Sequence, residues 1–185
     1  MIDTSLKGKL LVATPALGAG IFDRSVVLVI EHDDAEGAFG VVLNRPSATG
    51  VDGALPEWST LAASPSVVFV GGPVSPEAAI CLARVSLPEA RGWIPVVGSV
   101  GALDLSQDAT LLAAAVDEVR LYAGYAGWTR GQLEDEIEAG AWFVVDADEH
   151  DVLSDDPDSL WQTVLRRQGG RLAMFAAYPP DPTNN

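Results

Sequence analysis

Short apolar runs separated by turn residues recur along this chain, and they predict β-strands. Residues 26–30, Val-Val-Leu-Val-Ile, form a continuous apolar run typical of a strand buried on both faces. Residues 39–43 predict a second strand. The segment 33–37 between them, Asp-Asp-Ala-Glu-Gly, has turn chemistry, so we expect an antiparallel hairpin. Further strands are predicted at 9–13, 67–70, 94–100, 119–123 and 142–145.

Capping residues indicate where helices begin and end. Ser75, followed by a proline and a glutamate, predicts one helix start, and Asp156 with Pro157 predicts another. Two arginines and then the glycine pair at 169–170 end this last helix. A third helix is expected after Ser106, with one apolar face formed by residues 111, 112, 115, 116 and 119.

A fourth helix is predicted after residue 129. Thr129 and Gln132 have the spacing of a reciprocal capping box, and Trp128 with Leu133 has the spacing of a hydrophobic staple. Gly140 supplies a left-handed helix end. These signals explain the segment as structure, although its acidic residues also form a face that a basic partner could contact.

The mixture of these elements predicts the fold class. Strands and helices alternate irregularly and the hairpin is antiparallel, which favours α+β over a doubly wound parallel sheet. We expect a single compact domain over residues 1–185, with a mixed, largely antiparallel sheet, packed helices and a polar C-terminal tail at 179–185.

Charge disfavours one class of function. The chain has 11 Lys and Arg against 26 Asp and Glu, a formal net charge of -15. Because binding of DNA needs a basic footprint, this balance disfavours direct contact with nucleic acid, and solubility explains the acid excess. A lone cysteine, no signal-peptide pattern and no apolar run of about 18 residues lead us to expect a cytoplasmic protein without a membrane span.

A candidate anion site lies at one end of the predicted hairpin. If residue 31 faces residue 39, residue 44 faces residue 26, and the end of the sheet gathers Asp23, Arg24, Asn44 and Arg45. Two guanidinium groups beside an amide can bind an anion, because arginine offers a rigid fork of donors. The alternative is an ion pair between Asp23 and Arg45, with Asn44 as a turn residue.

Two further groups could extend this site. Gly71 and Gly72 leave a predicted strand and enter the helix expected at Ser75, where backbone N–H groups can bind an anion. The alternative for these glycines is a tight turn. Tyr125 and Trp128 are candidate walls of the pocket.

Catalytic and metal chemistry has less support. His32 is predicted at the opposite end of the hairpin, roughly 15–20 Å from Asn44 at ~3.3 Å per residue. Beside Asp33 and Asp34 it could be a metal ligand or a proton carrier, or it could cap the turn. The acidic segment 146–151 does not fit a calcium loop and predicts a solvated loop, and Cys81 lies in an apolar context typical of a core thiol. We expect no catalytic residue, no metal and no cofactor.

Taken together, several segments resemble the AlgH/YqgE family of small bacterial proteins. The resemblance is carried by 22–27, 31–32, 40–46, 71–74 and 124–128, and it extends through Gln132, Leu133, Glu136, Trp142 and residues 181–184. It implies a compact α+β domain. Some members are labelled transcriptional regulators through alginate synthesis, but the net charge of -15 argues against DNA contact here. The family brings no catalytic residues to carry over.

The leading hypothesis is a non-enzymatic cytoplasmic protein that binds a small anionic ligand or a protein partner and acts indirectly in regulation. Its candidate binding residues are Arg24, Asn44, Arg45, Gly71, Gly72, Tyr125 and Trp128. One alternative is a hydrolase or lyase that uses His32 with the neighbouring carboxylates. A second alternative is a transcriptional regulator that binds DNA directly, which the charge disfavours.

Overall fold

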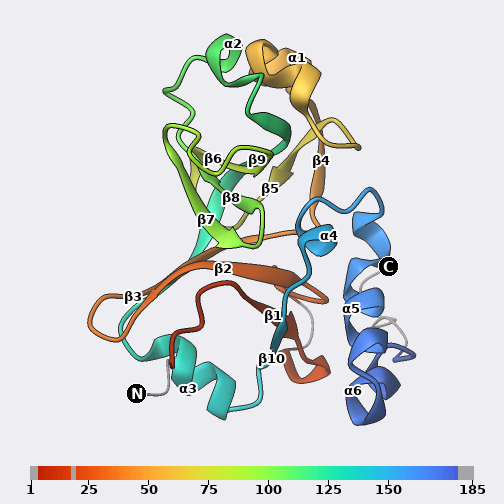
Figure 1. The fold of residues 1–185 in the computed structure, drawn as a ribbon. Helices are drawn as coiled ribbons and strands as arrows, with labels where there is room; N and C mark the ends of the chain where they lie inside the picture. The colour runs from red at the N-terminus through yellow and green to blue at the C-terminus, as the bar shows by residue number, and fades with distance from the viewer. Residues whose placement is uncertain (1–3, 18–19, 179–185) are drawn as a thin grey trace.

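One long strand, β9 (Val116–Trp128), joins the two parts of the sheet that Figure 1 shows one above the other. The structure is a computed structural model that describes residues 4–17 and 20–178, so the predicted tail at 179–185 lies outside the described residues. The last residues of β9 pair with β3, and its earlier residues pair with β6 and β5. The other strands are β1 (Lys9–Ala13), β2 (Val26–Asp33), β3 (Gly37–Val42), β4 (Pro46–Gly50), β5 (Val67–Val70), β6 (Val74–Val85), β7 (Trp93–Val97), β8 (Val100–Leu103) and β10 (Trp142–Asp146).

The strand order is β10-β1-β2-β3-β9-β6-β8-β7, with β4 and β5 joined to β9 through β5. Within residues 4–17 and 20–178, every pairing of named strands is antiparallel except that of β5 with β9. The predicted fold class, α+β with a mixed and largely antiparallel sheet, is confirmed.

Helices cover both faces of the lower part of the sheet. On one face Leu10 and Leu28 share a core with Trp161 and Val164 of α5 (Leu160–Gln168). On the other face, the alternate strand residues pack with Leu133 of α3 (Gln132–Glu138). This two-sided burial is the reason that residues 26–30 are apolar without alternation.

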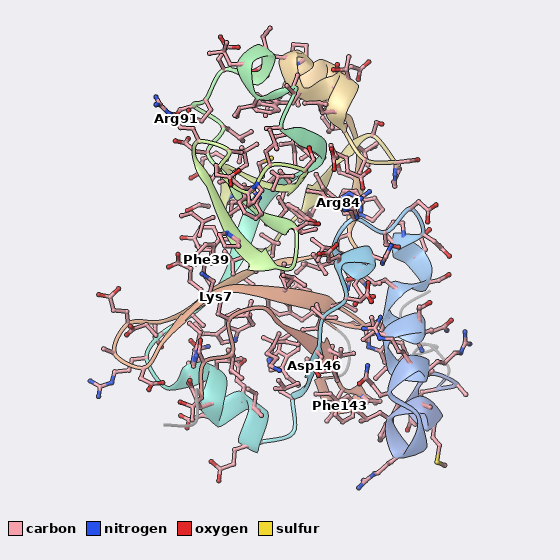
Figure 2. The ribbon with its side chains drawn as sticks, in the orientation of Figure 1. Lys7, Phe39, Arg84, Arg91, Phe143 and Asp146 are labelled. Carbon is pink, nitrogen blue, oxygen red and sulfur yellow. The ribbon has the colours of Figure 1, made fainter. Side chains whose placement is uncertain are left out.

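Short helices complete the fold. Figure 2 labels Phe143 on β10, whose ring lies 5.3 Å from that of Phe175 at the end of α6. None of the helices in the described part of the chain is both long and apolar enough to cross a membrane. The remaining helices are α1 (Val51–Ala54), α2 (Ala109–Leu112), α4 (Glu149–Val152) and α6 (Gly170–Phe175), with 3-10 turns η1 (Pro15–Leu17), η2 (Pro56–Leu61) and η3 (Pro157–Ser159).

Two predicted elements are wrong, one because of a long-range strand pairing and one because of a local turn. The helix expected at Ser75 is the start of strand β6, where the register on β9 shifts between Val74 and Ala79, so Pro76 lies in an irregular stretch without a ladder partner. The single strand predicted at 94–100 is two strands, β7 and β8, because Gly98 adopts a φ of 54° and turns the chain.

Two predicted helices exist with different limits. The helix after Ser106 spans only Ala109–Leu112, capped by Asp108, and residues 116 and 119 belong to β9. The helix predicted from Thr129 begins at Gln132, with Gly131 at φ 76° as its N-cap. Half of the predicted capping box forms, because the Gln132 side chain accepts the backbone N–H of Thr129 at 3.0 Å.

Candidate anion-binding site

A pocket of about 410 Å³ lies at the end of the sheet where the chain enters β2 and leaves β3. Its arginines come from the β2 entry and the β3–β4 junction, and one wall comes from η3 and α5. The structure therefore brings together the cluster predicted at this end of the hairpin. The lining residues are Gly20, Asp23, Arg24, Asn44, Arg45, Asp158, Trp161 and Gln162.

Asn44 holds the chain that carries Arg24. Its Oδ1 accepts the backbone N–H of Val26, and its Nδ2 donates to the backbone carbonyl of Arg24, both at 2.9 Å. Asn44 is buried, with 7% of its surface exposed. Residue 31 faces residue 39 as assumed, but a bulge between Val29 and Glu31 shifts the pairing beyond it by one residue. Asn44 thus holds the backbone at Arg24 and Val26 in place by two hydrogen bonds, which is more than the role of a turn residue.

Arg24 is fixed at three points. Its backbone has a φ of 53°, a conformation that side-chain-bearing residues rarely adopt. Its guanidinium carbon lies 4.8 Å from the ring centre of Trp161, a cation–π contact. Its Nη2 donates to the backbone carbonyl of Tyr178 at 2.5 Å. The guanidinium is therefore held at the pocket, and no carboxylate of residues 4–17 and 20–178 forms an ion pair with it.

Arg45 is held from the other side of the pocket. Its Nη2 donates to the backbone carbonyl of Asp23. Burial lowers the pKa of Arg45, and the negative charge of Asp23 opposes that shift. The contact to a carbonyl, rather than to the Asp23 carboxylate, differs from the ion pair considered as the alternative.

The predicted binding residues do not all share this pocket. Gly71 and Gly72 lie where the chain crosses β9, and a side chain at Gly72 would come within 2.2 Å of the Tyr125 backbone. Close approach of two backbones explains these glycines. Because the helix expected at Ser75 is a strand, the argument for an anion at a helix start loses its premise. Tyr125 packs edge-on against Phe39, with ring centres 5.7 Å apart.

A second pocket, of about 470 Å³, lies at the far end of the hairpin and includes His32 and Trp128. The His32 Nδ1 accepts the backbone N–H of Leu6 at 3.0 Å, and its Nε2 lies 2.5 Å from Oε1 of Glu134. His32, Asp34 and Glu134 have potential ligand atoms within 4.8 Å of one another, which is the spacing of a metal site.

The hydrogen bonds of His32 argue against metal and base chemistry. Because Nδ1 accepts a backbone N–H, we assign the proton of the neutral ring to Nε2, which donates to Glu134. Neither nitrogen then has a lone pair free for a metal or for a substrate proton. The hydrogen bond from His32 also lowers the pKa of Glu134. Asp33 accepts the backbone N–H groups of Ala35 and Glu36, as a turn residue does.

Glu136 is a residue whose role the sequence did not reveal. Its Oε2 accepts the indole N–H of Trp128 at 2.7 Å and that of Trp142 at 3.0 Å, and its Oε1 accepts the side chain of Gln132 at 3.1 Å. Trp128 is thus part of a buried cluster on the α3 side of the sheet, away from the arginine pocket. The spacing 132–136 on one helix was the available signal.

The acidic segment 146–151 is more ordered than a solvated loop. Asp148 and Asp151 form the capping box of α4. Asp151 is buried and accepts both Nη atoms of Arg167, at 2.7 and 2.8 Å. These residues line a third pocket of about 690 Å³, where Arg84 also pairs with Glu118. The arginines of this larger pocket are therefore already neutralised.

Comparison with known proteins gives consistent matches over nearly the whole chain. A sequence model of the family described as AlgH-like matches residues 10–173. The UPF0301 protein SCO2948 of Streptomyces coelicolor is 51% identical, with 98% of this chain and 96% of that protein covered. A UPF0301 protein of Mycobacterium tuberculosis is 47% identical, with 96% and 90% covered.

Two solved structures share the fold. The crystal structure of protein DIP2367 from Corynebacterium diphtheriae has a TM-score of 0.87 and 31% identity, with 93% of this chain and 92% of that chain covered. The solution structure of the AlgH protein from Pseudomonas aeruginosa has a TM-score of 0.70 and 28% identity, with 98% of each chain covered.

Proposed function

This chain belongs to the AlgH-like family, and we propose that it binds a small anion between Arg24 and Arg45 without transforming it. The observation that carries this proposal is how these two arginines are paired. Among the described residues, neither forms an ion pair with a carboxylate, although the chain has 26 Asp and Glu for 11 Lys and Arg. Arg84 and Arg167, in the neighbouring pocket, do form such pairs.

Contacts within the protein organise the two arginines of the pocket. Arg24 is stacked on Trp161, and Arg45 is tied to a backbone carbonyl, so little side-chain entropy is lost when an anion binds. A guanidinium has five N–H donors, and the hydrogen bonds described above use one from each arginine. The remaining donors can form charge-assisted bonds to a carboxylate or phosphate group.

A small molecule fits this site better than DNA or a large partner. The volume of about 410 Å³ lies in the range of small-molecule pockets, roughly 300–1,000 Å³. The net charge of -15 disfavours nucleic acid, so the regulatory role included in this proposal is indirect and depends on the ligand, in a protein of the cytoplasm. Arg24 also holds the carbonyl of Tyr178, so a ligand that draws Arg24 inward alters how the chain is held there.

The test is calorimetric titration of inorganic phosphate and of acetate into the wild-type protein and into Arg45→Ala. Loss of one charged donor costs about 1.5–3 kcal/mol, so we expect Arg45→Ala to bind roughly 10- to 100-fold more weakly. Arg91→Ala is the matched control, because Arg91 is exposed on the upper part of the molecule in Figure 2, away from α5, and its loss changes the net charge equally. Equal affinity of Arg45→Ala and wild type, or no saturable binding, contradicts the proposal.

A further inference from the structure

The arginine pocket contains negative as well as positive side chains. Arg24 and Arg45 share it with Asp23 and Asp158. Within the described residues, none of these four groups is within ion-pair distance of an opposite charge. Two cations and two anions therefore line one pocket without forming an ion pair with one another, although the negative charge of Asp23 acts on Arg45.

Different contacts position the positive and the negative side chains of the pocket. Arg24 is stacked on Trp161 and tied to Tyr178, and Arg45 is tied to the backbone of residue 23. Asp158 is exposed in the first turn of η3, on the wall that leads into α5. These backbone contacts use one donor of each guanidinium group and leave the other donors for a ligand.

This arrangement favours ligands that carry both charges over ligands of a single charge. A simple anion that contacts the arginines also lies near two carboxylates, and like charges in a partly enclosed site repel. A simple cation that contacts the carboxylates is repelled by the two arginines in the same way. A ligand with both charges, each beside its opposite, satisfies the four groups together.

We propose that the ligand of this pocket is a small zwitterion of the amino-acid class, with its carboxylate at Arg24 and Arg45 and its ammonium group at Asp158 and Asp23. This inference rests on the proposed function and adds the positive group of the ligand to it. The amide of Gln162 also lines the pocket and can accept from the ammonium group or donate to the carboxylate.

The test compares ligands that share a carbon skeleton. Calorimetric titrations use γ-aminobutyrate against butyrate, β-alanine against propionate, and glycine against acetate, with propylamine as the cation without a carboxylate. We expect at least one zwitterion to bind at least tenfold more tightly than its matched anion, and propylamine not to bind. The series also measures the separation of charges that fits the pocket.

Variants of the two aspartates test whether they bind the ammonium group of the ligand. Asp23→Asn and Asp158→Asn, made singly and together, leave the backbone carbonyl that holds Arg45 and remove the negative charges. We expect the double variant to lose the preference for the zwitterion at least tenfold while binding the simple anion as well as wild type or better. Asp135→Asn, an exposed change on α3, is the control and keeps the preference.

The outcomes separate the two proposals. If the simple anions bind, are lost with Arg45→Ala and are matched by the zwitterions, the zwitterion inference is overturned and the proposed function stands. If neither anions nor zwitterions bind, both are overturned. A zwitterion preference that survives the double variant also overturns the inference.

Discussion

Replacement of Glu136 by alanine tests the contact that ties α3 to the sheet. Its carboxylate accepts the indole N–H groups of Trp128 and Trp142, whose rings meet edge to face at 6.1 Å. The two tryptophans are 6% and 4% exposed, so water replaces the lost acceptor only in part. An unsatisfied buried donor costs about 1–3 kcal/mol, which gives about 2–6 kcal/mol for two. Because Glu136 is half-buried and its site admits some water, we expect a loss of about 3 kcal/mol in the free energy of unfolding.

The assay is equilibrium urea unfolding followed by far-ultraviolet circular dichroism, with near-ultraviolet dichroism of the tryptophans in the folded state. Glu136→Gln keeps an acceptor oxygen but loses the charge, so we expect a smaller loss of about 1–2 kcal/mol. Glu138→Ala is the matched control on the same helix, exposed, with an expected change within about 0.5 kcal/mol. A loss for Glu136→Ala that is no larger than that for Glu138→Ala refutes the reasoning.

Two further predictions concern Cys81 and Asn44. Burial raises the pKa of Cys81 to about 12 and also raises that of Tyr122, so both groups stay protonated in the folded state while the unfolded chain ionises them. The stability from Cys81 is fully present below about pH 8.5 and is lost as pH rises from there to about pH 12. The free energy of unfolding measured in urea should therefore fall less steeply with pH for Cys81→Ala than for the wild type. If the free energy of unfolding falls as steeply with pH in Cys81→Ala as in the wild type, the predicted contribution of the buried Cys81 thiol is wrong. Asn44→Ala removes the acceptor of the Val26 N–H and the donor to Arg24, so we expect a loss of about 2–3 kcal/mol in urea unfolding and weaker phosphate binding in calorimetry. Wild-type affinity in a folded Asn44→Ala protein shows that Arg24 does not need these hydrogen bonds.

The sequence predicted most where the determining contacts are local. Strands 9–13 and 67–70 have the predicted limits, because short apolar runs bounded by turn residues leave little choice. The hairpin brought Arg24 and Arg45 together for the same reason, since two adjacent strands and one turn fix which ends meet. A bulge of one residue did not change that conclusion.

The failures have tertiary causes. The sequence Ser75-Pro76-Glu77 has the capping pattern of a helix start, yet the residues after it pair with the long strand β9, and this pairing overrides the local preference. The contact of His32 with Glu134 joins residues 102 positions apart, and no spacing rule indicates it. Trp128 is a candidate wall of the pocket from the sequence, whereas Glu136 and Trp142 hold it in a different part of the core.

The central claim is that Arg24 and Arg45 bind one anionic group together. The most direct measurement follows the side-chain Nε–H resonances of all arginines by NMR during titration with γ-aminobutyrate and, separately, with inorganic phosphate. The account predicts that the Arg24 and Arg45 resonances shift and saturate with one common dissociation constant, while that of Arg91 stays in place. Equal shifts at all arginines, or saturation at only one of the two, would contradict it.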